Sequence, residues 1–212
     1  MGKKVVTGLV RFSYFNAFKP RLNTLSGKSE FSTQVLIPKS DTVTIAAVKA
    51  AISEAVADKF GGKRPAGLRN PLKDGDAVVE DGATPLGAEY AGHFYFSAKA
   101  SEDKPPQIVD SEGQSILSAQ EFGSGDYGRI SVTFYGYDQK VNKGVSAWLN
   151  NVQFLENGEA LDGRSDAATD FAAPIAKPKS AAPAVKKAMA PKKAAPPPED
   201  EGEEETADED WA

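Results

Sequence analysis

Apolar and polar residues alternate along several stretches of the chain, and this pattern predicts β-strands. The predicted strands are rich in β-branched and aromatic residues and span 5–15, 30–37, 90–100, 128–137 and 145–155. In the first of them, the alternation places Val10, Phe12 and Tyr14 on one side, which we expect to be buried. It places Arg11, Ser13 and Phe15 on the opposite, exposed side.

Two further strands show the same division. Their expected inward residues are Phe94, Phe96 and Ala98 in one strand and Ile130, Val132 and Phe134 in the other. Their expected outward residues are His93, Tyr95, Ser97 and Lys99 in one strand and Ser131, Thr133, Tyr135 and Tyr137 in the other. The segments 16–28 and 63–76 are predicted to be basic loops.

One segment, 41–60, has the spacing of an amphipathic helix. Asp41 or Thr42 can cap its first amides, and Gly61 with Gly62 can end it. The apolar stripe consists of Ile45, Val48, Ile52, Val56 and Phe60. Several strands with one helix predict a mainly β fold, a small closed or partly closed β-barrel with the helix inserted and packed on the sheet.

The composition changes sharply near the end of the chain. Residues 172–198 are mostly Ala, Pro and Lys and contain no acid, whereas 199–212 hold nine carboxylates and no basic residue. We therefore predict a domain over 1–160, a flexible linker over 161–198 and a disordered acidic tail over 199–212. The tail ends in Asp208, Glu209, Asp210 and Trp211 before Ala212. It is either a solubilising segment or a polyanion that binds the body or a partner.

The charge balance separates the body from the tail. Residues 1–157 contain eighteen Lys and Arg against seventeen Asp and Glu, while the whole chain has a net charge of −5. The body can therefore carry a basic surface although the chain is acidic. The absence of cysteine excludes disulfides and thiolate metal sites. No apolar run has the length of a signal peptide or a membrane span, so we expect a cytoplasmic protein without a membrane partner.

Aromatic and basic residues share the exposed side of the predicted strands, which is the mixture that single-stranded nucleic acid requires. Cations neutralise phosphates, and flat rings stack on bases. The alternative is that these are ordinary aromatic residues of a half-buried sheet. The predicted DNA-binding residues are Arg11, Phe15, Lys19, Lys28, Tyr95, Lys99, Tyr135, Tyr137, Lys140 and Lys143.

Signals for an enzyme are weak. Asp74 and Asp76 flank Gly75, a pattern typical of a turn, although paired acids could also hold Mg²⁺ in a nuclease. His93 is the only histidine and has no cysteine or second histidine to share a metal. Phosphate-binding and nucleophile motifs are absent. We therefore predict no catalytic activity, no metal and no cofactor.

Several motifs in order resemble a known family. They are Arg-Phe-Ser-Tyr, Val-Leu-Ile-Pro-Lys-Ser-Asp, Pro-Leu-Lys-Asp-Gly-Asp, Tyr-Ala-Gly-His-Phe-Tyr, Lys-Pro-Pro-Gln-Ile-Val-Asp and Gly-Val-Ser-Ala-Trp-Leu-Asn-Asn-Val-Gln-Phe. Over about residues 5–160 the chain resembles the OB-fold single-stranded DNA-binding proteins of tailed bacteriophages.

The resemblance implies a β-barrel that coats single-stranded DNA without strong sequence preference during phage replication or recombination, in the host cytoplasm. It also implies that the acidic tail recruits replication proteins, such as a polymerase or a helicase, and competes with DNA for the groove. Better-known members end in Phe, whereas Trp211 is penultimate here. A second hypothesis is an adaptor protein whose tail binds basic partners.

Overall fold

The computed structural model describes residues 2–24, 27–77, 86–139 and 142–161. The predicted linker and acidic tail, from 162 onward, and the predicted DNA-binding residue Lys140 lie outside these ranges.

Five long strands form a closed ring. They are β2 (Val10–Asn23), β3 (Lys28–Pro38), β5 (His93–Ser101), β7 (Tyr127–Asp138) and β8 (Lys143–Glu156). The order around the ring is β2, β3, β5, β8, β7 and back to β2, with every pair antiparallel except β5 and β8. This is the connectivity of the five-stranded OB-fold barrel. The predicted fold class, a mainly β OB-fold-like barrel with an inserted helix, is confirmed.

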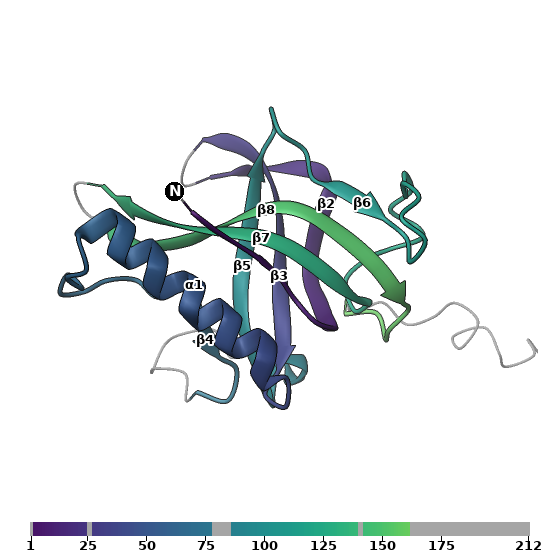
Figure 1. Cartoon of the computed structure of the whole chain (residues 1–212). Coiled ribbons are helices and arrows are strands. Elements are labelled where there is room, and N and C mark those ends of the chain that lie inside the picture. The colour runs from purple at the N-terminus through teal and green to yellow at the C-terminus, as the bar shows by residue number, and fades with distance from the viewer. Residues whose placement is uncertain (1, 25–26, 78–85, 140–141, 162–212) are drawn as a thin grey trace, which may run out of the picture. The chain divides into compact units, whose positions relative to one another are not determined.

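Three short strands extend the ring. β1 (Lys3–Val6) pairs with β7, β4 (Lys73–Asp74) with β5, and β6 (Gln107–Val109) with β8. Figure 1 shows β1, β7 and β8 crossing in front of β3 and β5, so the barrel has two walls. β8 belongs to both, because it pairs with β7 and also with β5.

The core fills the space between the two walls. Phe12, Phe96 and Phe134 are fully buried, and the rings of Phe96 and Phe134 lie 5.4 Å apart. Burying rings of this size supplies much of the hydrophobic stabilisation of a small domain.

The helix α1 (Thr42–Phe60) confirms the prediction for 41–60. The Asp41 carboxylate accepts a hydrogen bond from the Thr44 amide at 3.0 Å, and Gly61 ends the helix in the left-handed conformation. The buried face of α1 includes Ile45, Val48 and Ala55 and packs on β1 and β7. The inserted helix therefore covers part of the barrel and leaves the outer side of β3 and β5 uncovered by it (Figure 1).

The first predicted strand is wrong in its bounds. Residues 5–15 fall in two strands, β1 and β2, and β2 continues to Asn23 through most of the predicted loop 16–28. A short 3₁₀ turn, η1 (Ala88–Tyr90), holds Tyr90 outside the strand that we expected to begin there.

The alternation in β2 fails after Phe12. Ser13 is buried, Tyr14 is 64% exposed and Phe15 is half-buried, where we expected Tyr14 inside and the other two outside. The cause is a β-bulge: Ser13 pairs with Gln34 but Asn16 pairs with Ser32, so β2 has one extra residue. Two smaller errors are Ser131, which is buried, and Phe94, which is only half-buried.

Candidate nucleic-acid interface

The outer side of β3 and β5 carries five outward side chains, which we call the β3–β5 face. On β5 the residues Phe96 and Ala98 point into the core, so their neighbours point outward. The register pairs Lys99 with Ser32 and Ser97 with Gln34. The face consists of Ser32, Gln34, Tyr95, Ser97 and Lys99. OB-folds bind oligonucleotides on this wall, between the hairpin loops at its sides.

Tyr95 is held between a second tyrosine and a lysine. The Tyr90 and Tyr95 rings meet edge to face at 4.9 Å, and the Lys73 ammonium lies 6.0 Å from the centre of the Tyr95 ring. The Tyr90 hydroxyl donates to the Gln34 side chain at 2.6 Å. Burial raises the pKa of both phenols above its ordinary value, so each stays a hydrogen-bond donor at neutral pH. Lys73 adds a cation that was not among the predicted site residues, and the buried Tyr90 ring supports Tyr95 from beneath the surface.

Lys99 forms an ion pair with Glu30. The same Glu30 carboxylate accepts a hydrogen bond from the Asn23 side chain at 2.7 Å. The pair therefore ties the face to the β2–β3 hairpin. A phosphate that binds Lys99 competes with the Glu30 carboxylate for the ammonium group.

Two hairpins flank the face. Lys19 and Lys28 are exposed on the β2–β3 hairpin, at the end of β2 and the start of β3. Lys143 begins β8 and pairs with Asp138 across the β7–β8 hairpin at 3.2 Å. Three of the predicted lysines therefore lie beside the loops that OB-folds use to hold oligonucleotides.

Arg11 and Phe15 are half-buried, so the exposed placement predicted for them is wrong. The Arg11 guanidinium donates to the Gly125 carbonyl at 2.9 Å and to the Glu159 carbonyl at 2.8 Å. The Phe15 ring packs against Phe122 at 4.4 Å. The observed contacts of Arg11 fasten the chain at Gly125 and Glu159 to β2, and its role toward DNA stays a prediction.

Tyr135 and Tyr137 lie on the other wall. In the β7–β8 register Tyr135 is opposite Ser146 and Tyr137 is opposite Gly144. Tyr135 is 38% exposed, and its ring lies 6.5 Å from that of Trp148. Trp148 pairs in turn with Lys99 of β5. Trp148 therefore stands where the two walls meet, beside a cation and a ring, and was not among the predicted residues.

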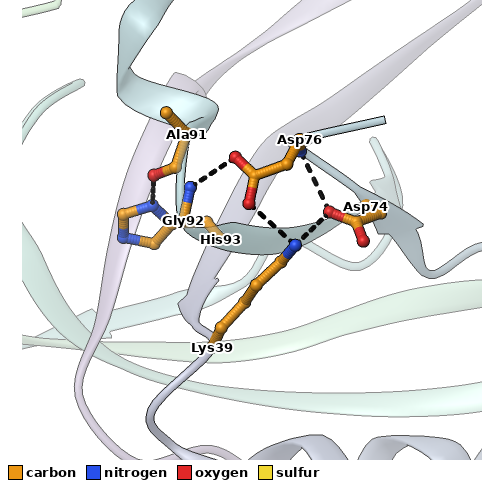
Figure 2. Close-up of polar contacts among 6 residues, drawn as sticks. All are labelled: Lys39, Asp74, Asp76, Ala91, Gly92 and His93. Carbon is orange, nitrogen blue, oxygen red and sulfur yellow. Dashed lines mark hydrogen bonds and ion pairs between the residues drawn. The ribbon is translucent and has the colours of Figure 1, made fainter. Parts of the chain in front are cut away.

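Asp74 and Asp76 both bind the Lys39 ammonium, as Figure 2 shows. The Lys39 ammonium lies 2.6 Å from the Asp74 carboxylate and 2.8 Å from that of Asp76. Its hydrogen bonds lower the pKa of both carboxyls, and they raise the pKa of Lys39. Asp76 also accepts the Gly92 amide at 2.7 Å, which fastens the turn to the start of β5. These contacts give the two carboxylates a structural role in the turn.

Within the described ranges, no three His, Cys, Asp or Glu side chains are arranged to hold a metal ion. Nor is any helix there long and apolar enough to cross a membrane.

Comparison with known sequences identifies the family. The family model of the single-stranded DNA-binding protein of Enterobacter phage Enc34 matches residues 3–181. Protein p50 of Acyrthosiphon pisum secondary endosymbiont phage 1 is 35% identical over 171 residues, which is 76% of this chain and 87% of p50. The chain belongs to the Enc34 family of phage single-stranded DNA-binding proteins. The predicted resemblance is confirmed.

Solved structures share the Enc34-family fold. The Enc34 protein in complex with single-stranded DNA aligns with a TM-score of 0.63 and 22% identity, over 74% of this chain and 89% of that chain. The gp2.5 single-stranded DNA-binding protein of bacteriophage T7 aligns with a TM-score of 0.51 and 15% identity, over 86% of this chain and 100% of that chain. At these identities the likeness establishes the barrel and leaves individual contacts to be argued from this chain.

Proposed function

We propose that this member of the Enc34 family binds single-stranded DNA, without strong sequence preference, along the β3–β5 face and its flanking hairpins. The observation that carries the proposal is the register of β5 with its neighbours: Tyr95 and Lys99 point outward together, and Trp148 lies beside Lys99. The solved complex of the Enc34 protein with single-stranded DNA, on a similar barrel, supports the same activity here.

The chemistry follows from the residue types. The exposed lysines of the face and hairpins neutralise phosphates, and Tyr95, Trp148 and the two tyrosines of β7 offer rings for stacking. Neither interaction depends strongly on the base, so the protein can coat a strand of almost any sequence. We place this coating in phage DNA replication or recombination, in the host cytoplasm.

We further propose that the acidic tail regulates the binding. Its nine carboxylates resemble a phosphate backbone in charge, so the tail competes with DNA for the lysines. Asp208, Glu209, Asp210 and Trp211 together offer charge and an aromatic side chain to a replication protein such as a polymerase or a helicase. DNA that displaces the tail then frees it for the partner.

The interface is tested by fluorescence anisotropy with a labelled oligonucleotide over a range of salt concentrations. Changing both Lys73 and Lys99 to Gln should weaken binding. It should also reduce the magnitude of the negative slope of log K against log salt by about 1.4, since each phosphate contact to a single strand contributes about 0.7. Lys49→Gln, an exposed lysine on α1 that contacts Phe94 and belongs to neither the face nor the hairpins, is the matched control and should leave the slope unchanged. Equal slopes in all three proteins would rule out this face.

The β7 rings are tested separately. Tyr135→Ala and Tyr137→Ala should each weaken binding by about 1 kcal/mol, the lower range for one stacked base, while circular dichroism shows a folded barrel. Loss of the folded spectrum would mean that the rings serve packing. Absence of any oligonucleotide binding by the unchanged protein would favour the adaptor hypothesis instead.

A further inference from the structure

A cavity of about 410 Å³ lies at the bulge of β2, and we call it the bulge cavity. Its lining includes Tyr14, Phe15, Asn16, Arg21, Glu89 and Ser124. Ser13 also lines it and pairs with Gln34, so the cavity adjoins the β3–β5 face. Its volume is within the range of small-ligand pockets, about 300–1,000 Å³.

The bulge turns a ring outward at a conformational cost. Tyr14 has a φ of 48° and is the one non-glycine residue with positive φ in the part of the chain that the structure describes. The Asn16 side chain donates to the Tyr14 carbonyl at 2.9 Å, and the Phe15 amide donates to the Ser124 hydroxyl at 2.8 Å. These bonds hold the bulge in place. Strain that the surroundings maintain in this way, and bulges that re-aim a side chain, occur preferentially at binding sites.

Two charged groups of opposite sign line the same cavity. Neither Arg21 nor Glu89 makes a side-chain hydrogen bond or ion pair with another described residue, so both are available to a ligand. A guanidinium is a donor suited to phosphate. A carboxylate only accepts hydrogen bonds. The exposed Tyr14 ring adds a stacking surface, and the half-buried Phe15 ring an apolar wall.

We propose that the bulge cavity binds one nucleotide of the bound single strand. The base stacks on Tyr14, an adjacent phosphate binds Arg21, and an exocyclic amine of the base donates to Glu89. This inference rests on the proposed function and adds a specific subsite to it.

The subsite has a base preference that follows from Glu89. Cytosine presents an amine at the position where thymine presents a carbonyl oxygen, and adenine also presents an amine. A carboxylate attracts the amine and repels the oxygen. The preference concerns one nucleotide among several, so we expect the protein to bind oligo(dC) about five-fold more tightly than oligo(dT) of the same length.

The test compares short labelled oligo(dC) and oligo(dT) by anisotropy with the full chain. The five-fold ratio should persist in Glu102→Gln, because this exposed carboxylate at the end of β5 does not line the bulge cavity. It should fall to about one in Glu89→Gln, because an amide can both donate and accept. Arg21→Gln should weaken both oligonucleotides equally and lower the salt slope by about 0.7.

Three outcomes would overturn the inference. One is a ratio of one in the unchanged protein, and another is an unchanged ratio in Glu89→Gln, even if that variant binds both oligonucleotides more tightly for losing a negative charge. The third is a salt slope in Arg21→Gln that equals the slope of the unchanged protein. If the unchanged protein bound neither oligonucleotide, the proposed function itself would fail, which is a distinguishable result. Thermal unfolding of each variant confirms that it is folded.

Discussion

At the scale of single residues, the Lys39 ammonium determines how one turn responds to pH. It bonds to Asp74 and Asp76, and these bonds hold the pKa of both carboxyls below the ordinary value of 3.8. A carboxyl with a lower pKa in the folded state stabilises the protein above its ordinary pKa. This stabilisation is lost as the pH falls through the lowered value. The turn, and the start of β5 that it supports, should therefore loosen only in acid.

Lys39→Gln should lower the unfolding temperature at neutral pH by a small amount, because these groups are exposed. The difference from the unchanged protein should shrink as the pH falls below 3.8, where both carboxyls become protonated. Circular dichroism melts at a series of pH values measure it. Lys49→Gln is the matched control, because Lys49 and Lys39 lie 5.2 and 5.1 Å from the centre of the Phe94 ring and only Lys39 bonds to the carboxylates. A difference that stayed constant with pH would contradict the assignment.

At the scale of elements, the bulge in β2 gives stability and binding opposite requirements. Tyr14 occupies a backbone conformation that only glycine adopts without strain. Its ring nevertheless lies where the proposed DNA strand passes. Glycine at this position would suit the fold, and tyrosine would suit the DNA.

Tyr14→Gly should therefore raise the free energy of unfolding by about 1 kcal/mol and weaken DNA binding at the same time. Tyr14→Ala should weaken binding to a similar degree without the gain in stability, since alanine keeps the strain. Urea unfolding and oligonucleotide anisotropy on the same samples separate the two effects. Equal stability of the two variants would show that the positive φ costs little.

Periodic elements could be predicted from the sequence, and the relations between them could not. The helix over 41–60 was predictable because its N-terminal cap, its apolar stripe and the glycine at its end, Gly61, all indicate the same helix. The alternation in β5 was predictable for the same reason, and it places Tyr95 and Lys99 outward as expected. The exposed ring of Tyr14 was not predictable, because one extra residue in β2 reverses the expected side.

Contacts across strands were equally hidden. Trp148 lies beside Lys99 only because of the parallel register of β5 with β8, which no local pattern encodes. Tyr90 is aromatic like the residues of β5, so the sequence pattern assigns it to that strand. Gly92, at a φ of 72°, nevertheless separates it from β5. The resemblance to a known family predicted the barrel, and the strand register in the structure then identified the candidate site.

At the scale of the whole molecule, charge is divided between two parts of the chain. Residues 1–157 are nearly neutral, with eighteen basic and seventeen acidic residues, and the tail carries nine carboxylates. Proposed competition between tail and DNA is electrostatic, so it should weaken as salt screens both.

Deleting residues 199–212 should tighten binding to single-stranded DNA, most strongly at low salt. Anisotropy titrations of both proteins across a salt series measure this. Trp211→Ala in the full chain separates the ring from the charge: it should leave DNA affinity near that of the unchanged protein while weakening capture of a replication protein. Identical affinities of the full and shortened chains at every salt concentration would end the competition hypothesis.

The position of β8 between β7 and β5 has a consequence for how the protein reaches its native state. The ring can close only after β8, the last long strand, has paired with β5 and β7. The β5–β8 pairing joins segments about fifty residues apart along the chain. Closure of such sequence-distant pairs is slow, on a scale of roughly milliseconds to seconds. Until then β5 and β7 expose unpaired edges, so the newly made chain passes through a stage in which it is open to aggregation.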